Sequence, residues 1–189
     1  PVEVSYTVNY YWQNLEDDNY TLHESVEETG FTESPVGEID GYENKYKGFY
    51  ALPYDTTTPI AADGSTVVEI YYDRYYYLMT FDLGGGYGVE PVYARYGAPI
   101  EVGTPTRPGY TFQGWQLNNE DAQVPPTMPA ENQNYVAEWQ AVDKANVTLV
   151  FWGENADNED YSYLGSAVTT AVPGSSFTYN PDGSGGADI

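Results

Sequence analysis

Two acidic turns carry the oxygen-rich side chains that a hard cation binds. Asp17 and Asp18 lie in the first turn, and Asp157 and Asp160 lie in the second. Calcium takes carboxylate and carbonyl oxygens, but neither cluster contains the alternating Asp ladder of an EF-hand. Asn and Asp side chains in turns also bond their own backbone without a metal. The stronger interpretation is a pair of solvated turns, with calcium as the weaker alternative and no cofactor.

Two further patterns suggest catalysis only superficially. Residues 84–88 read Gly-Gly-Gly-Tyr-Gly, but they lack the G-x-G-x-x-G spacing and the lysine of a phosphate-binding loop. We expect a turn there that needs positive φ. His23 is the single histidine and falls on an expected strand, so it is a poor basis for a Ser-His-Asp triad. We therefore predict no catalytic residues and no enzyme activity.

Aromatic side chains offer a different chemistry, because their rings stack on sugars and anchor protein partners. The tryptophans Trp12, Trp115, Trp139 and Trp152 fall at repeating positions, so we expect them in the core. The better candidates for binding are tyrosines of a large surplus, such as Tyr75, Tyr76 and Tyr87. They point weakly to a host glycan or a surface protein as the partner.

The elements that position these residues are expected to be strands. Of the aromatic residues, 21 are tyrosine, 6 are phenylalanine and 4 are tryptophan, and tyrosine favours the half-buried face of a strand. The hydrophobic content of 41% allows a packed core. Gly and Pro interrupt most of the chain, which leaves little room for helices. The fold class expected is mainly β, with small antiparallel or mixed sheets arranged end to end.

Charge and composition exclude several partners. The chain has 29 acidic and 6 basic residues, which gives a formal net charge of −23. Such a charge repels phosphate groups, so we expect no nucleic acid and no membrane contact within this segment. There is no cysteine, which removes disulfides and thiolate metal sites. No apolar run is long enough to span a membrane, and any targeting signal of a secreted parent is expected outside this chain.

An internal repeat organises the sequence. The segment from Val8 to Leu22 reappears from Leu149 to Leu164, at an offset of about 140 residues. Each copy places an aromatic strand that ends near a Trp before an acidic turn, and a second strand follows. The chain therefore divides into a first module over residues 1–74, a second over 75–140, and the start of a repeat or a small β unit over 141–189.

Local signals suggest the elements within the modules. In the first module we expect a hairpin after Val2–Trp12, short strands and loops in the middle, and a second hairpin turning at Asp63-Gly64. In the second module we expect a turn at residues 84–86 and at most one helical turn, over Asn118–Gln123.

The two junctions differ in length. Strand character continues through Asp73-Arg74, and two extended residues span only roughly 7 Å, so this joint should resist bending. The second junction, Gln140–Asn146, is longer and should be looser.

The second module resembles a Listeria-Bacteroides repeat, the unit also called the internalin B repeat. The matching positions, in order, are Thr80-Phe81-Asp82, Gly84-Gly85, Tyr96-Gly97, Pro105, Gly109–Phe112, Gly114-Trp115 and Tyr135–Trp139. The first module is similar, less specifically, to mucin-binding-protein repeats, through its Val-x-Tyr-Tyr start and through residues 46–49 and 63–74. Both resemblances imply a β-grasp-like sheet crossed by a segment on one face, and neither carries catalytic residues.

These resemblances imply a non-catalytic repeat segment of a Gram-positive-type bacterial cell-surface protein. Its expected role is an extracellular stalk or spacer with possible adhesive function, attached to the cell wall through regions outside this chain. The alternative is a glycan- or glycoprotein-binding module that uses exposed tyrosines. We expect an elongated monomer with separate cores, and an enzyme fragment is the weakest interpretation because no pocket of convergent titratable groups is indicated.

Overall fold

The computed structural model describes residues 1–177 and residue 179. The described chain is mainly β, as predicted, and its single helical element is the short 3₁₀ turn Tyr42–Asn44. No helix among the described residues is long and apolar enough to cross a membrane. By its contacts the chain forms two compact units. The first comprises residues 1–80, 91–101 and 124–134, and the second comprises residues 81–90, 102–123 and those from Tyr135 on. The boundaries at 74/75 and 140/141 stay a prediction.

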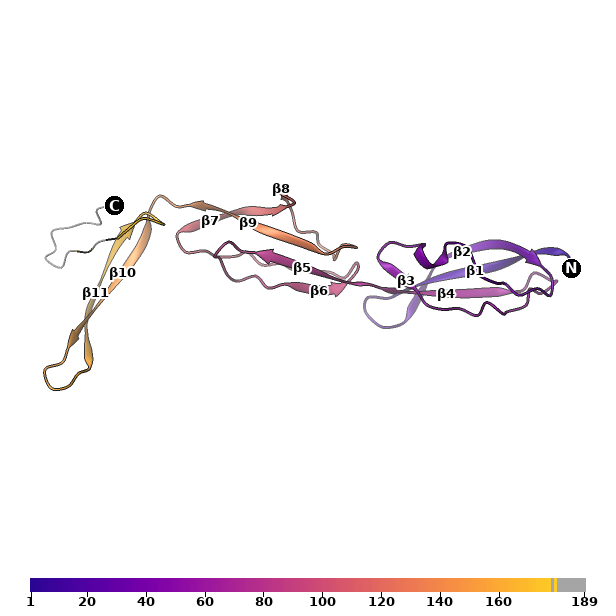
Figure 1. Ribbon diagram of the computed structural model, residues 1–189, viewed down its shortest axis with the longest axis horizontal. Helices are drawn as coiled ribbons and strands as arrows, with labels where there is room; N and C mark the ends of the chain where they lie inside the picture. Colours follow the sequence, from indigo (N-terminus) through magenta and orange to yellow (C-terminus); the bar gives the residue numbers. More distant parts are fainter. Residues whose placement is uncertain (178, 180–189) are drawn as a thin grey trace. The chain divides into compact units, whose positions relative to one another are not determined.

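A four-stranded mixed sheet forms the centre of the first unit, in the order β2-β1-β4-β3 (Figure 1). Its strands are β1 (Glu3–Gln13), β2 (Tyr20–Phe31), β3 (Phe49–Ala51) and β4 (Val67–Arg74). The hairpin β1–β2 is antiparallel, as predicted, with a bulge at Tyr10/Tyr11. Strand β4 runs parallel to β1, from the pair Thr7↔Val67 to the pair Trp12↔Tyr72. The crossover connection from β2 to β4 covers residues 32–66 and passes β1, because β4 pairs with the edge of β1 that lies away from β2.

The first core lies between this sheet and its crossover. Alternate residues of β1 and β4 face inward and are almost completely buried, in keeping with the period-two alternation of a strand. They are joined by Phe49 and Ile60, and the partly buried Val36, Ile39, Tyr42, Tyr46 and Tyr54 of the crossover pack against them. The buried hydrophobic members of β1 and β4 are Tyr6, Val8, Tyr10, Val68, Ile70 and Tyr72.

The Asp63-Gly64 turn is present, but the hairpin predicted around it is wrong. Gly64 has φ of 75°, its N–H bonds the Ala61 carbonyl at 3.2 Å, and the Ser65 N–H bonds the Asp63 carboxylate. The residues before this turn do not pair with β4, whose neighbours are instead β1 and β3. An Asp-Gly turn reverses the chain locally, but it does not determine which strand pairs with the run that follows.

The remaining strands of the central region form a five-stranded sheet with the order β6-β5-β9-β7-β8. These strands are β5 (Tyr76–Asp82), β6 (Val92–Arg95), β7 (Tyr110–Leu117), β8 (Glu120–Ala122) and β9 (Gln133–Ala141). The Gly turn is confirmed, since Gly84 and Gly85 have φ of 55° and 89° and the Gly86 N–H bonds the Leu83 carbonyl.

No helical turn forms at Asn118–Gln123, where the sequence left room for at most one. Asn118 and Asn119 both adopt positive φ, 54° and 65°, and they form the two-residue turn of the hairpin β7–β8. Asn tolerates this left-handed region better than other residues with side chains, and two such residues in sequence match the favoured hairpin turn.

A separate two-stranded sheet follows, made of β10 (Ala145–Glu154) and β11 (Tyr161–Ala171) (Figure 1). Only residues 142–144 separate β9 from β10, so the second junction is shorter than the sequence suggests. The Val142 N–H bonds the Gly109 carbonyl at 3.0 Å. Whether this junction is the looser one stays a prediction.

Candidate functional site: a network anchored by two arginines

The acidic turn of the first hairpin is held by its own side chains. The Asp17 carboxylate accepts hydrogen bonds from the Asn14 side chain at 3.0 Å and from the Asn19 N–H at 2.8 Å. These bonds, above all the one from Asn14, lower the pKa of Asp17. Thr21 Oγ1 in turn donates to the Asn14 side-chain oxygen at 2.7 Å. The turn therefore satisfies its polar groups locally, as Asx turns do.

The second acidic turn uses a different acceptor from the one its carboxylates suggest. Asn158 accepts from the Asn155 side chain at 3.1 Å and from the Asp160 N–H at 2.9 Å, while Asp157 is exposed. Among the described residues, no group of three or more His, Asp or Glu side chains is arranged to hold a metal ion. The calcium candidates Asp17, Asp18, Asp157 and Asp160 thus gain no ligand set.

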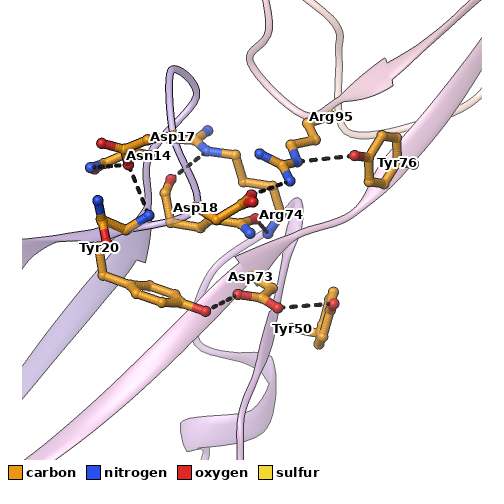
Figure 2. A network of polar contacts seen from close by, with 11 residues as sticks. Asn14, Asp17, Asp18, Tyr20, Tyr50, Asp73, Arg74, Tyr76 and Arg95 are labelled. Carbon is orange, nitrogen blue, oxygen red and sulfur yellow. Dashed lines mark hydrogen bonds and ion pairs between the residues drawn. The ribbon is translucent and has the colours of Figure 1, made fainter.

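Asp18 instead faces an arginine that lies 77 positions away in the sequence. Arg95 donates through Nη2 to Asp18 Oδ1 at 2.7 Å and through Nε to Tyr76 Oη at 3.1 Å (Figure 2). Asp18 is 83% exposed in its side chain and Arg95 only 23%. The pKa of Arg95 is raised, mainly by the bond to Asp18. An ion pair this exposed adds only about 0–1 kcal/mol, so it selects a geometry more than it stabilises the fold.

Arg74, at the end of β4, makes the stronger set of contacts. Its backbone N–H and its Nε donate to Gln13, at 3.0 Å to the side-chain oxygen and 2.8 Å to the carbonyl. Nη1 donates to the Tyr96 carbonyl at 3.0 Å, and the guanidinium lies 4.8 Å from the Phe49 ring centre. Burial lowers the pKa of Arg74. A planar guanidinium binds two carbonyls and a ring at once in a way that lysine cannot reproduce.

Asp73 completes the network on the opposite side of β4. It accepts from Tyr20 Oη at 2.6 Å and from Tyr50 Oη at 3.2 Å (Figure 2). The bond to the Asp73 carboxylate, followed by burial, raises the pKa of Tyr20 to about 12. Successive residues of β4 therefore connect β2 and β3 through Asp73, and β1 and residue 96 through Arg74.

Close packing accompanies these polar bonds. The Tyr96 ring meets Phe49 edge-on at 5.5 Å, and the Tyr96 N–H bonds the Tyr75 carbonyl at 2.8 Å. A Cβ placed on Gly48 would lie 2.4 Å from the Tyr96 ring, and Gly48 has φ of 88°. Only glycine fits there. The Tyr75 N–H also bonds the Gly48 carbonyl at 3.0 Å.

The predicted tyrosine candidates are all exposed, and each has contacts of its own. Tyr75 is 47% exposed and packs on Tyr50, while Tyr76 is 49% exposed and stacks on Tyr93 at 5.1 Å. Tyr87 is 59% exposed and pairs by its backbone with Thr106. Tyr93, which the sequence reasoning missed, is 68% exposed.

The core assignment of the tryptophans holds for some of them and fails for one. Trp115 is buried, and Trp12 packs against the first core with the His23 ring stacked on it at 3.5 Å. Trp139 is half-buried and donates to the Leu83 carbonyl. Trp152 is 59% exposed, so its assignment to the core is wrong. The two hairpins carry bulges at matching places, so Trp152 is the equivalent of Tyr11, whose side chain faces outward. The equivalent of the inward-facing Trp12 is Gly153.

Sequence reasoning missed Arg74 and Arg95 as the centres of the network. Their partners lie on distant segments, so no local motif marks them. The available signal is scarcity, because only three arginines occur among 189 residues. All three guanidinium groups lie over an aromatic ring, the third being Arg107 at 3.7 Å from Tyr110.

The sheets and the network define small β repeat modules held by structural polar contacts. One module has a recognisable family: residues 80–143 match the model of the divergent InlB B-repeat domain. The match supports the repeat module predicted over 75–140 and fits a repeat segment of a surface protein. No curated protein matches the chain. The resemblance of the first module to mucin-binding-protein repeats stays a prediction.

Proposed function

We propose that the chain is a non-catalytic segment of a bacterial cell-surface protein and serves as an extracellular stalk. The observation that carries the proposal is the B-repeat match at residues 80–143, flanked by two hairpins of one sequence pattern. Attachment to the cell wall belongs to regions outside this chain. The acidic surface keeps neighbouring copies apart by charge repulsion. An antibody against this chain should label intact, unpermeabilised cells of the source organism, and labelling only after permeabilisation would contradict it.

A stalk must resist bending, and we propose that the network around Arg74 and Arg95, which lies within the first unit, makes that unit stiff. The chain has no cysteine, which allows two spin labels to be placed cleanly. Labels at the exposed positions Glu43→Cys and Glu101→Cys should give a narrow distance distribution. Arg74→Ala should broaden this distribution, because it removes the bonds to Gln13 and Tyr96. A distribution that is broad before the substitution would argue against a stiff first unit.

A second candidate is glycan binding by exposed tyrosines. The observation in its favour is the stacked pair Tyr76 and Tyr93, with the Arg95 side chain beside it. Exposed aromatic rings next to hydrogen-bond donors bind sugar rings by stacking and by polar contact. Binding on a glycan array should then be lost in Tyr93→Ala. An array without any hit would leave the stalk as the only proposal.

A further inference from the structure

The hairpin β10–β11 repeats the hairpin β1–β2 in three dimensions as well as in sequence. Equivalent residues are 141 positions apart, as Asn14 and Asn155 are, and the bulges at Tyr10/Tyr11 and Phe151/Trp152 obey the same offset. The turns use equivalent bonds, in which Thr21 and Ser162 donate to the two Asn side chains at 2.7 and 2.6 Å.

The equivalence continues beyond the second strand. After β2, the Ser34 N–H bonds the Phe31 carbonyl at 3.1 Å, and after β11 the Ser175 N–H bonds the Val172 carbonyl at 3.2 Å. The residue before each serine has positive φ, 64° at Glu33 and 80° at Gly174. The two hairpins are therefore two copies of one structural unit. The first copy covers residues 4–34 and the second covers residues 145–175.

The first copy shows what this unit binds. The edge of β1 that faces away from β2 accepts β4 in parallel register, and the Thr7 N–H donates to the Thr66 carbonyl at 3.0 Å. In the second copy, β10 pairs with β11 alone within the described part of the chain. Tyr6, Val8 and Tyr10 are at most 6% exposed, whereas their equivalents Val147, Leu149 and Phe151 are only half-buried.

We propose that the free edge of β10 is an acceptor for a second strand of the β4 type. The register of the first copy places Thr148 to Gly153 against this strand, with the residue equivalent to Tyr71 stacked on Trp152 as Tyr71 stacks on Tyr11 at 4.9 Å. That strand carries apolar residues at alternate positions, as Val68, Ile70 and Tyr72 do. An unpaired edge beside an apolar face is a template for such pairing.

The source of the strand is the same polypeptide, after the hairpin. In the first copy β4 follows β2 through a crossover that also covers the apolar face, with Ile60 and Phe49 in the core. A strand delivered without this crossover would leave Leu149 and Phe151 uncovered. The occupant is therefore a crossover and a strand together. This assignment does not depend on whether the protein serves as a stalk.

The test supplies residues 35–74 of this chain, once as a separate peptide and once appended after Ser175 in place of residues 176–189. Amide hydrogen exchange of Thr148, Val150 and Trp152 should slow by about tenfold or more in the appended chain, because alternate amides of β10 face the free edge. Protection by the separate peptide as well would support the same pairing. No protection in either arm would overturn the proposal.

A proline variant provides the matched control. Thr148→Pro removes the amide equivalent to the Thr7 N–H, and proline is tolerated on an edge whose amide has no partner. It should abolish the new protection while leaving the unmodified chain as stable as before. Thr7→Pro, at the occupied edge, should destabilise the first unit. Protection of β10 that rises with the concentration of the unmodified chain alone would assign the edge to a second copy and overturn the assigned source.

Discussion

Gly48 and Tyr96 illustrate how single residues decide the packing around Arg74. Tyr96 occupies the space that any side chain at position 48 would need, and its ring also contacts Phe49. The glycine is required both by its positive φ and by this close approach, and these two requirements can be separated by experiment.

Gly48→Ala should destabilise the first unit by about 2–5 kcal/mol, since the left-handed backbone costs about 1–2 kcal/mol and overpacking adds about 1–3 kcal/mol. Gly41→Ala is the matched control, because Gly41 has φ of 73° and open space around its Cβ position. The free energy of unfolding of Gly41→Ala should fall only by the cost of the left-handed backbone. Urea unfolding measures the stability of both variants. Equal losses of stability would mean that the Tyr96 ring moves aside at no energetic cost.

Alkaline pH tests the tyrosine–carboxylate bonds. The native pKa of Tyr20 is about 12, above the value near 10 of an unfolded tyrosine. The native state therefore holds this proton more tightly, so the stabilisation is complete below pH 10 and is lost as pH rises towards 12. Burial and the Glu24 carboxylate likewise raise the pKa of Tyr46.

Tyr20→Phe should therefore lower stability at neutral pH and flatten its decline between pH 10 and 12. Chemical unfolding at a series of pH values measures the slope. A variant whose slope equals that of the unmodified chain would contradict the assigned bond to Asp73.

At the scale of the elements, β4 is the strand on which the first unit depends. It is parallel to β1, antiparallel to β3, and ends in Asp73 and Arg74, which bond to segments on both sides. The two arginines of the network differ in their partners, because Arg74 bonds two backbone carbonyls and Arg95 bonds the exposed Asp18, so their contributions to stability should differ.

Arg74→Ala should cost about 2–3 kcal/mol, because it leaves two carbonyls without their charged donor. Arg95→Ala should cost at most about 1 kcal/mol, because its partner Asp18 is exposed. Thermal unfolding at low and high salt separates them, since only the Arg95 contribution should shrink when salt is added. A larger loss in Arg95→Ala than in Arg74→Ala would reverse the expected order of the two arginines.

The strands and turns that could be predicted from the sequence are those marked by local signals, namely period-two alternation and turn residues. The first hairpin, the run Val67–Tyr72 and the turn at Gly84 follow from such signals. The parallel pairing of β4 with β1 does not, because period-two alternation states which face is buried but not which strand is the neighbour. The core position predicted for Trp152 is wrong for a related reason: matching residue types between copies ignores the bulge, which fixes the register. The arginine network includes the pairs Gln13–Arg74 and Asp18–Arg95, which are 61 and 77 positions apart, and such distant pairs leave no local trace in the sequence.

At the scale of the whole molecule, charge is the dominant feature. Acidic residues outnumber basic ones by 29 to 6, and the structure pairs few of them: the ion pairs among the described residues are Lys45–Glu24 and Arg95–Asp18. Repulsion among the remaining carboxylates opposes compaction, and salt screens it.

The melting temperature should therefore rise when sodium chloride is increased from about 0.01 M to about 0.5 M, where the Debye length falls several-fold. Calorimetry at constant pH measures this, and potassium chloride should act equally because the effect is non-specific. A melting temperature that falls with salt would mean that the attractive pairs outweigh the repulsion.

The parallel pairing of β1 with β4 has a consequence for biosynthesis. At about 5–20 residues per second, the roughly 43 residues between Phe31 and Arg74 take about 2–9 seconds to emerge from a ribosome. During this interval the completed hairpin waits with its acceptor edge open. The completed chain offers β4 two acceptor strands of one pattern, β1 and β10. Because β4 is synthesised before β10, it can pair with β1 before the second acceptor exists, so the order of translation favours pairing within one repeat.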